Sequence, residues 1–464
     1  MEYRIERDSL GEVKVPKERL YGAQTARSLE NFKIGSSHFP LEVIHQLILI
    51  KKAAAKVNAE LNVLDSTRAE LICEAADQLL QGGFEKEFPL YLFQTGSGTQ
   101  SNMNVNEVIS NLVSKNVGKE LGSKDPIHPN DHVNKSQSSN DVIPTAIHMA
   151  VVQECRNKLI PDLKTLSSAL QVKENEFKDV VKVGRTHLMD ATPLSLGSEF
   201  GGYKVQIDHA IVSIEEALHH VEELAIGGTA VGTGINSPIG FQKMMLKELN
   251  HLTKGKFREA KSLFEALSSE DNLVFLGGAL NRLACALLKI ANDVRLYASG
   301  PRAGFGELEL PANEPGSSIM PGKVNPTQCE SITMIAAQVM GNCTTLTIAA
   351  SQGHFQLNVY RPVIAQALLQ SIAILSDGCR NFAKKCIQGI KINQKRINHH
   401  LHYSLMLVTA LVPHIGYDKA AKIAYHANEK QISLKEAAIE LGHLTADQYE
   451  SYMDVHKMAF PHGH

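Results

Sequence analysis

The chain has 464 residues, of which 43% are hydrophobic and 21% are charged, and its formal net charge is −2. This composition is typical of a globular protein with a large core, and it excludes a disordered chain and a strongly basic surface for nucleic acid. Seven scattered cysteines without a Cys-x-x-Cys pair favour free thiols in a reducing compartment. The N-terminus lacks a signal-like apolar region, and no apolar run reaches the ~18 residues of a membrane span. We therefore expect a cytoplasmic protein, or the mature form of an organellar protein, that binds neither a membrane nor nucleic acid.

The first part of the chain passes from an irregular arm into helices. Residues 1–40 contain proline, glycine and short alternating patches, which predict an irregular arm with a small hairpin. Residues 41–80 have helical periodicity. The stretch 95–102 then interrupts the helical pattern with Gly, Ser and Thr. Its amides and the hydroxyls of Ser97 and Thr99 suit a bound carboxylate or phosphate, and a loop that only caps a helix is an equally good interpretation.

A second concentration of polar residues lies between residues 122 and 145. The run His128–His132 contains two histidines and an aspartate, but without a further ligand pair a metal site is disfavoured. A turn that donates hydrogen bonds to an anion is the preferred interpretation. The run Ser138–Asn140 immediately precedes a helical stretch from about Val142, which indicates a helix N-terminus that faces a ligand.

The middle of the chain is dominated by predicted long helices. Apolar residues at steps of three and four mark three segments: Ile207, Ile211, Ile214, Leu218 and Val221; Leu273, Leu276, Leu280, Leu283, Leu287, Ile290 and Val294; and Ile364, Leu368, Ile372, Leu375 and Cys379. Such heptad seams predict helices packed along one another in a bundle. Helices of about 30 residues would be about 45 Å long, which is more than one globular subunit usually needs. We therefore expect a symmetric oligomer.

Several loops connect these helices. Gly184–His187 separates two predicted helical segments. Gly227–Asn236 has the wrong glycine spacing for a dinucleotide site and follows a helix, so that interpretation is rejected. Gly300–Val324 is rich in glycine and proline, and so long a connection is typical of a lid or an active-site loop. After about residue 395, shorter helices predict a small C-terminal domain.

The end of that long loop carries the clearest chemistry. Two adjacent hydroxyls, Ser317 and Ser318, follow a glycine, and Lys323 follows a Pro-Gly turn. Asn325 and Pro326 then open a predicted long helix. A lysine and an asparagine at a helix N-terminus would form a site for a small anion.

The segment Gly316–Glu330 resembles the signature of the fumarase/aspartase superfamily, and Pro-Gly-Lys-Val-Asn-Pro-Thr-Gln-Cys-Glu is similar to the variant of class II (iron-independent) fumarases. Further matching motifs follow the same order along the chain: Gly96–Asn106, His128–Asp141, Gly184–Pro193, Gly227–Asn236 and Pro413–Asp418. The resemblance implies a mainly α fold with three domains, at 1–138, 139–395 and 396–464. It also implies a homotetramer in which the central helices of four subunits form a twenty-helix core.

The activity implied by the resemblance is the reversible hydration of fumarate to L-malate, a step of the citric acid cycle. Malate dehydration would remove a proton beside a carboxylate and pass through a doubly charged aci-carboxylate. The implied substrate is a small dicarboxylate, with no cofactor and no metal. The alternatives are an aspartate ammonia-lyase on the same scaffold and a non-catalytic structural homologue.

The resemblance also assigns roles to individual residues. Ser317 matches the proton-abstracting base, and His187 matches the acid/base for water, oriented by Glu330 of another subunit. Lys323 and Asn325 would hold the carboxylate on which charge accumulates. The implied substrate-binding residues are Ser97, Gly98, Thr99, Ser138, Ser139, Asn140, Thr186, Ser318, Lys323, Val324 and Asn325. A second anion site is implied at His128, Pro129, Asn130 and Asp131.

Overall fold

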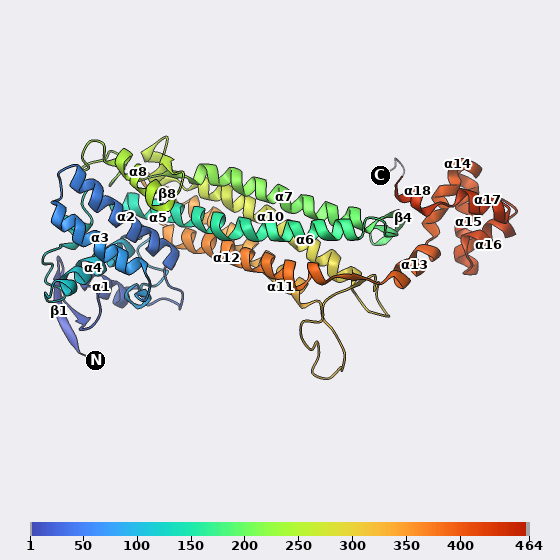
Figure 1. The fold of residues 1–464 in the computed structure, drawn as a ribbon, viewed down its shortest axis with the longest axis horizontal. Coiled ribbons are helices and arrows are strands. Elements are labelled where there is room, and N and C mark those ends of the chain that lie inside the picture. The colour runs from blue at the N-terminus through green and yellow to red at the C-terminus, as the bar shows by residue number, and fades with distance from the viewer. Residues whose placement is uncertain (1, 461–464) are drawn as a thin grey trace. The chain divides into compact units, whose positions relative to one another are not determined.

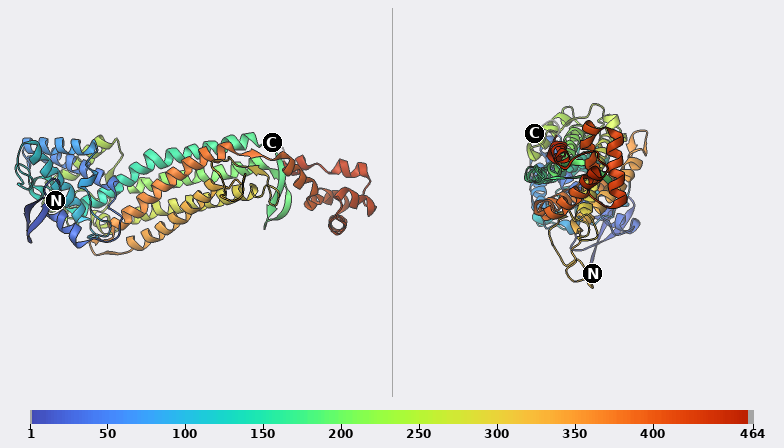
Figure 2. Two further views of the ribbon diagram at one scale, coloured as in Figure 1. Left: turned by 90° about the horizontal axis from the view of Figure 1, so that it is seen from below. Right: turned by 90° about the vertical axis from the view of Figure 1, so that its right-hand side faces the viewer.

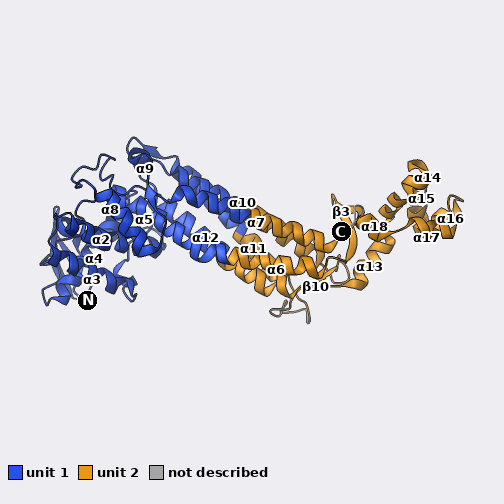
Figure 3. Cartoon of the chain, turned by 45° about the horizontal axis from the view of Figure 1, so that its top comes forward, with its two compact units in different colours: residues 1–161, 210–284, 336–376 blue, residues 162–209, 285–335, 377–464 orange. Residues whose placement is uncertain are grey.

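The computed structural model describes residues 2–460, and these residues are mainly α-helical, as predicted (Figure 1). The described strands form two-stranded pairs. The chain divides into two compact units (Figure 3). Unit 1 comprises residues 1–161, 210–284 and 336–376, and unit 2 comprises residues 162–209, 285–335 and 377–464. The three-domain division drawn from the sequence is a different partition, and it is still a prediction.

Unit 1 begins with the antiparallel hairpin of β1 and β2, which confirms the predicted N-terminal arm. Its helices include α2, whose apolar residues pack against α3 and α5. The elements of unit 1 are β1 (Tyr3–Asp8), β2 (Gly11–Pro16), α1 (Ala23–Asn31), α2 (Leu41–Glu60), α3 (Ser66–Leu80), α4 (Thr99–Asn116), α5 (Ser139–Glu154), β5 (Glu223–Leu224), α8 (Phe241–Thr253), β6 (Arg258–Glu259), α9 (Leu263–Ser268), β8 (Gly353–His354) and β9 (Leu357–Asn358).

Five long helices contribute residues to both units: α6 (Ile160–Glu176), α7 (Leu196–Val221), α10 (Asp271–Tyr297), α11 (Thr327–Ala350) and α12 (Arg361–Lys385). The predicted heptad seams of α7, α10 and α12 are buried along their full length. Within each unit, these helices lie side by side (Figure 2). The sequence pattern therefore identified both the helices and the faces that they bury.

Three helical segments are long and apolar enough to span a membrane by length and composition: Asp271–Tyr297, Thr327–Ala350 and Arg361–Gly389. This corrects the expectation that no stretch is long and apolar enough to span a membrane. That expectation rested on uninterrupted apolar runs and overlooked helices with interspersed polar residues. Each segment contains an apolar window of 18 residues. The share of that window that is buried within the chain is 56% in the first segment and 67% in the third, but only 28% in α11. Met334 and Ile348 of α11 are exposed. Less than a third of the α11 window is thus buried within its own chain.

Unit 2 contains a hairpin that the sequence pattern missed, formed by β3 (Val181–Thr186) and β4 (Met189–Ser195). The C-terminal helices α13 and α18 contact this hairpin. A separate apolar cluster that includes Leu411, Ile423 and Ala437 forms the core of the C-terminal helices. The remaining elements are β7 (Leu308–Glu309), β10 (Lys391–Ile392), α13 (Gln394–Tyr403), α14 (Val412–Ile415), α15 (Tyr417–Lys430), α16 (Leu434–Glu440), α17 (Ala446–Tyr452) and α18 (Val455–Ala459).

The first turn of α7 offers a test of packing in unit 2. A Cβ at Gly197 would lie 2.6 Å from both the Glu174 carbonyl oxygen and the Lys178 Cα, whereas a Cβ at Gly202 of the same helix meets nothing within 4 Å. Gly197→Ala should therefore lower the free energy of unfolding by about 1–3 kcal/mol. Gly202→Ala should raise it by up to about 1 kcal/mol, because alanine favours the helix. Chemical denaturation of both variants checks this, and effects of the same sign would contradict it.

Candidate active site

In unit 1, the first two polar loops are joined through their hydroxyls. Ser97 Oγ is hydrogen-bonded to Thr99 Oγ1 (2.8 Å), which is hydrogen-bonded to Ser139 Oγ (2.9 Å). Each loop ends at a helix N-terminus, because α4 begins at Thr99 and α5 at Ser139. Gly98, which lies between Ser97 and Thr99, has a φ of 74°, in the left-handed region that favours glycine. At the start of α5, the Asn140 N–H already donates to Ser138 Oγ (3.2 Å). The start of α4 and the three joined hydroxyls together form a site suited to a small anion.

A buried carboxylate fastens the glycine-rich loop to the start of α5. Asp141 accepts hydrogen bonds from the N–H groups of Ser138, Gly227 and Thr229, each at 3.0 Å. Burial raises the pKa of Asp141 to about 6, although these N–H groups oppose the shift. Asn140 adds a bond from Nδ2 to the Ala230 carbonyl (2.8 Å). The Gly227–Asn236 loop, which carries no dinucleotide fingerprint, thus supports the predicted ligand loop.

In unit 2, Thr186 and His187 lie at the tip of the β3–β4 hairpin. Thr186 pairs with Met189, so His187 and Leu188 form a two-residue turn, with φ values of 57° and 62°. Two positive φ values are those of a type I′ hairpin turn, which usually contains Asn-Gly. The imidazole is exposed and lies on a backbone conformation that costs free energy for a residue with a side chain.

The hairpin is anchored one residue before its tip. Arg185 donates from Nη1 (3.1 Å) and Nη2 (2.5 Å) to the carboxylate of Glu307, which is buried. His400 Nδ1 lies 2.8 Å from the same carboxylate, and Lys182 Nζ lies 3.7 Å away. Burial opposes ionisation of Glu307, but the bonds from Arg185 and the charges of Lys182 and Arg185 lower its pKa below the usual value. The position of His187 therefore depends on a buried ionic cluster.

The serine loop closes on itself before α11. Ser317 Oγ accepts hydrogen bonds from the N–H groups of Ile319 (3.3 Å) and Met320 (3.0 Å). Asn325 Nδ2 donates to the Gly316 carbonyl, and Gly316 N–H donates to the Lys323 carbonyl (3.0 Å). A Cβ at Gly316 would lie 2.2 Å from that carbonyl oxygen, so this close approach requires glycine. The loop borders a cavity of about 530 Å³ lined by residues that include Ser317, Lys323 and Val324.

The structure thus places the predicted site residues in three groups. Ser97, Thr99 and Ser139 are joined in unit 1, with Gly98, Ser138 and Asn140 beside them in sequence. Thr186 and His187 form the second group, and Ser317–Asn325 form the third, both in unit 2. Glu330 is exposed in the first turn of α11, and across the described residues it forms no hydrogen bond with His187. His187, Ser318, Lys323 and Glu330 are all exposed on the single chain.

Comparisons with known proteins cover the whole length of the chain. The lyase family profile matches residues 11–341, and the profile for the fumarase C C-terminus matches residues 407–459. The chain is 55% identical to a class II fumarate hydratase of Thermosynechococcus vestitus, over 98% of this chain and 97% of that protein. It is 54% identical to a mitochondrial fumarate hydratase of Danio rerio, over 99% of this chain and 90% of that protein.

A solved structure agrees with these relatives. The crystal structure of a class II fumarase from Schistosoma mansoni aligns with a TM-score of 0.97 at 44% sequence identity, and the alignment covers 100% of both chains. The chain belongs to the class II fumarase family. The resemblance seen in the sequence motifs is therefore confirmed, and so is the class of enzyme, a lyase.

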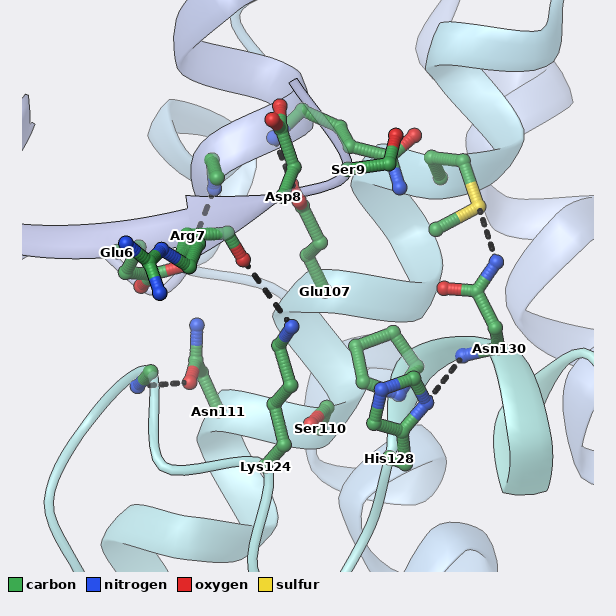
Figure 4. A pocket seen from close by; sticks show the side chains of 15 residues that line it. Glu6, Arg7, Asp8, Ser9, Glu107, Ser110, Asn111, Lys124, His128 and Asn130 are labelled. Carbon is green, nitrogen blue, oxygen red and sulfur yellow. Dashed lines mark hydrogen bonds between the residues drawn. The ribbon is translucent and has the colours of Figure 1, made fainter. Parts of the chain in front are cut away.

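The second anion site expected of a class II fumarase adjoins a cavity of about 470 Å³ in unit 1 (Figure 4). His128, Pro129 and Asn130 line this cavity, whereas Asp131 is not among its lining residues. His128 Nδ1 accepts from the N–H groups of Asn130 and Asp131, each at 3.2 Å. Among residues 2–460, no group of three or more His, Cys, Asp and Glu side chains is placed to hold a metal ion.

The opposite wall of this cavity includes three carboxylates, Glu6, Asp8 and Glu107 (Figure 4). Each is already bonded: Glu107, for example, accepts from the N–H groups of Gly22, Gln24 and Thr25. Their negative charge opposes a bound anion, while Arg7 and Lys124 of the lining favour one. Anion binding at this site is still a prediction.

Sequence reasoning missed the buried lysine beneath the unit 1 loops. Lys51 of α2 is fully buried, and its Nζ donates to Asn134 Oδ1 (2.9 Å) and Gln137 Oε1 (3.0 Å). Burial lowers the pKa of Lys51 to about 7, although the charge of Asp141 opposes the shift. A lysine inside the apolar pattern of residues 41–60 was the available signal. Lys51 therefore holds the side chains of Asn134 and Gln137 in the segment that leads into Ser138.

Replacement of Lys51 by Met should change how stability depends on pH. The pKa of this lysine is about 7 in the folded chain, against 10.5 for a lysine that is fully solvated, as in the unfolded chain. Between these values the unfolded chain binds the extra proton, so the contribution of Lys51 to stability rises with pH and is lost as pH falls through 7. The free energy of unfolding of the native chain minus that of Lys51→Met should grow from about pH 7 to pH 10. Denaturation at several pH values checks this, and a constant difference would contradict it.

Proposed function

We propose that the protein catalyses the reversible hydration of fumarate to L-malate. The observation that carries this proposal is the identity of more than half of all residues with proteins named fumarate hydratase, over nearly their full length. The site supports it, because anion-binding helix starts, an exposed histidine and a lysine-bearing serine loop suit a dicarboxylate. A role in the citric acid cycle follows from this reaction.

In the proposed dehydration of malate, the serine loop removes the proton. Ser317 acts as the base, and the two N–H groups that donate hydrogen bonds to its oxygen favour negative charge there. Proton loss places a second negative charge on the neighbouring carboxylate. Lys323 and Asn325, before the N-terminus of α11, hold that carboxylate and stabilise the aci-carboxylate most strongly when its charge is largest.

The remaining groups handle water and bind the substrate. His187 donates a proton to the departing hydroxyl and takes one from water in the reverse direction, with Glu330 of another subunit orienting its imidazole. Thr186, Ser318 and Val324 complete the contacts in unit 2. The joined hydroxyls of Ser97, Thr99 and Ser139, together with Gly98, Ser138 and Asn140, hold the substrate oxygens from unit 1. No cofactor takes part in this proposal.

The proposed assembly is a homotetramer whose active sites combine loops from three subunits. The exposed apolar side chains Met334 and Ile348 of α11 support this, because exposed apolar side chains on a long helix suit a contact with a partner surface. Leu188 and Met189 at the hairpin tip are 69% and 70% exposed, as expected of side chains that contact another subunit. We place the protein in the cytoplasm, although relatives include proteins named mitochondrial.

Two substitutions test the proposed chemistry. Ser317→Ala and His187→Asn should each lower kcat by about a hundredfold to ten-thousandfold, because each removes a proton-transfer group. The absorbance of fumarate formed from L-malate measures the rate, and light scattering measures the assembly, which should stay intact. The exposed residues Ser451 and His251 provide matched controls, Ser451→Ala and His251→Asn. Near-normal rates in both site variants would exclude the mechanism, and fumarate formed from L-aspartate but not from L-malate would exclude the substrate.

Mixed assemblies test whether the sites are shared. If Ser317 and His187 of one site come from different subunits, coexpressed Ser317→Ala and His187→Asn chains should regain about a quarter of the native rate per site, because a quarter of randomly assembled sites contain both native residues. Differently tagged chains allow the mixed tetramers to be purified. Mixed tetramers as inactive as either parent would show that each chain supplies both groups to the same site.

A further inference from the structure

Arg361, the first residue of α12, lies outside every motif that the sequence singled out. It is fully buried, and its guanidinium has an acceptor at each nitrogen. Nε donates to Glu270 Oε1 (3.1 Å), Nη1 to the Asn140 carbonyl (2.8 Å) and Nη2 to the Leu267 carbonyl (2.6 Å). One of these three bonds therefore reaches directly into the loop that carries Ser138, Ser139 and Asn140.

The backbone of the same residue bonds to the other hydroxyl loop. Arg361 N–H donates to the Gly96 carbonyl (3.1 Å), one residue before Ser97. The contact is close along this segment, since a Cβ at Gly96 would lie 1.5 Å from the Val359 carbonyl oxygen. Gly96 must therefore be glycine. Arg361 thus contacts both loops whose hydroxyls form the chain Ser97, Thr99, Ser139.

The cost of burying this charge explains why its geometry is fixed. Burial disfavours the charged guanidinium and lowers its pKa, whereas the charge of Glu270 raises it. Glu270 is itself buried, and its other oxygen lies 3.8 Å from His148 Nε2. A planar guanidinium with a hydrogen bond at each of its three nitrogens has one fixed orientation. A lysine, with a single ammonium group, cannot reproduce this arrangement. Movement of either loop would leave a buried donor without its acceptor.

We infer that Arg361 is a positioning residue for substrate binding, which sets the spacing between the Ser97–Thr99 loop and the Ser139–Asn140 loop. This inference rests on the proposed function, in which these loops hold the substrate oxygens. Arg361 does not touch the substrate. It positions groups that bind the dicarboxylate, whereas the proton-transfer groups Ser317 and His187 lie on other loops. Loss of Arg361 should therefore weaken substrate binding more than it slows the chemical step.

The test is Arg361→Lys, which keeps the positive charge beside Glu270 and removes the fork. A lysine ammonium has three donors at a single nitrogen and cannot reach all three acceptors, which lie around three separate nitrogens of the guanidinium. A lost hydrogen bond from a charged group is worth about tenfold in affinity or more. We expect KM for fumarate and for L-malate to rise about tenfold, with kcat changed less than about threefold. The inhibition constant of succinate, a saturated dicarboxylate that cannot react, should rise by the same factor as KM. The pKa values in the pH profile of kcat should be unchanged.

Arg380→Lys is the matched control, because Arg380 lies on the same helix and forms ion pairs with Asp162 and Asp377 in unit 2. It should leave KM and the succinate constant unchanged. Glu270→Gln provides a second variant, in which an amide oxygen still accepts from Arg361 without its charge, and both constants should rise as in Arg361→Lys but by less.

Three outcomes would overturn the inference. The first is loss of active protein with KM and the succinate constant unchanged, which is the signature of a purely structural arginine. The second is an equal shift in Arg380→Lys. The third, if Arg361→Lys does not fold, is an unchanged succinate constant in Glu270→Gln. Failure of the proposed function is distinguishable, because the native chain itself would then convert neither malate nor fumarate.

Discussion

A charge removed from water must be paired, and this constraint governs the polar loops of both units. Asp141 meets three N–H groups, Arg361 meets a carboxylate and two carbonyls, and Glu307 meets Arg185. Apart from Ser138, which precedes Asp141 by three residues, these partners are far apart in the sequence. A pairing of this kind tolerates little displacement, because any shift exposes an unpaired charge to an apolar interior. Buried charges thus give irregular segments the fixed geometry that catalysis requires.

The helical fold could be predicted from the sequence because its signal is local. The seam from Leu273 to Val294 repeats at steps of three and four, and it lies buried along α10 as expected. The hairpin of β3 and β4 was missed, since its alternation is interrupted at Gly184, where the backbone approaches the Thr192 carbonyl. Helix starts were placed a few residues late at α4 and α5, because capping residues such as Thr99 and Ser139 look like loop residues.

Residues of the candidate site could be predicted only where polar composition or the family resemblance singled them out. Ser97, Ser139, Ser317 and their neighbours stand in polar runs that interrupt helical texture, and the structure places them at helix starts and turns. The supporting residue Arg361 carries no such mark. Arg361 bonds to residues more than 90 positions away, so no window of sequence shows the pairing.

The turn at His187 and Leu188 shows how function sets a limit on robustness. Both residues hold left-handed backbone, where asparagine or glycine would cost less, by about 1 kcal/mol or more at each position. In the proposed mechanism, the imidazole of His187 is therefore held on a turn that asparagine or glycine would stabilise. Under that mechanism, a His187 replacement that favours the left-handed turn would stabilise the fold and remove the proton-transfer group, which is a trade-off between stability and activity.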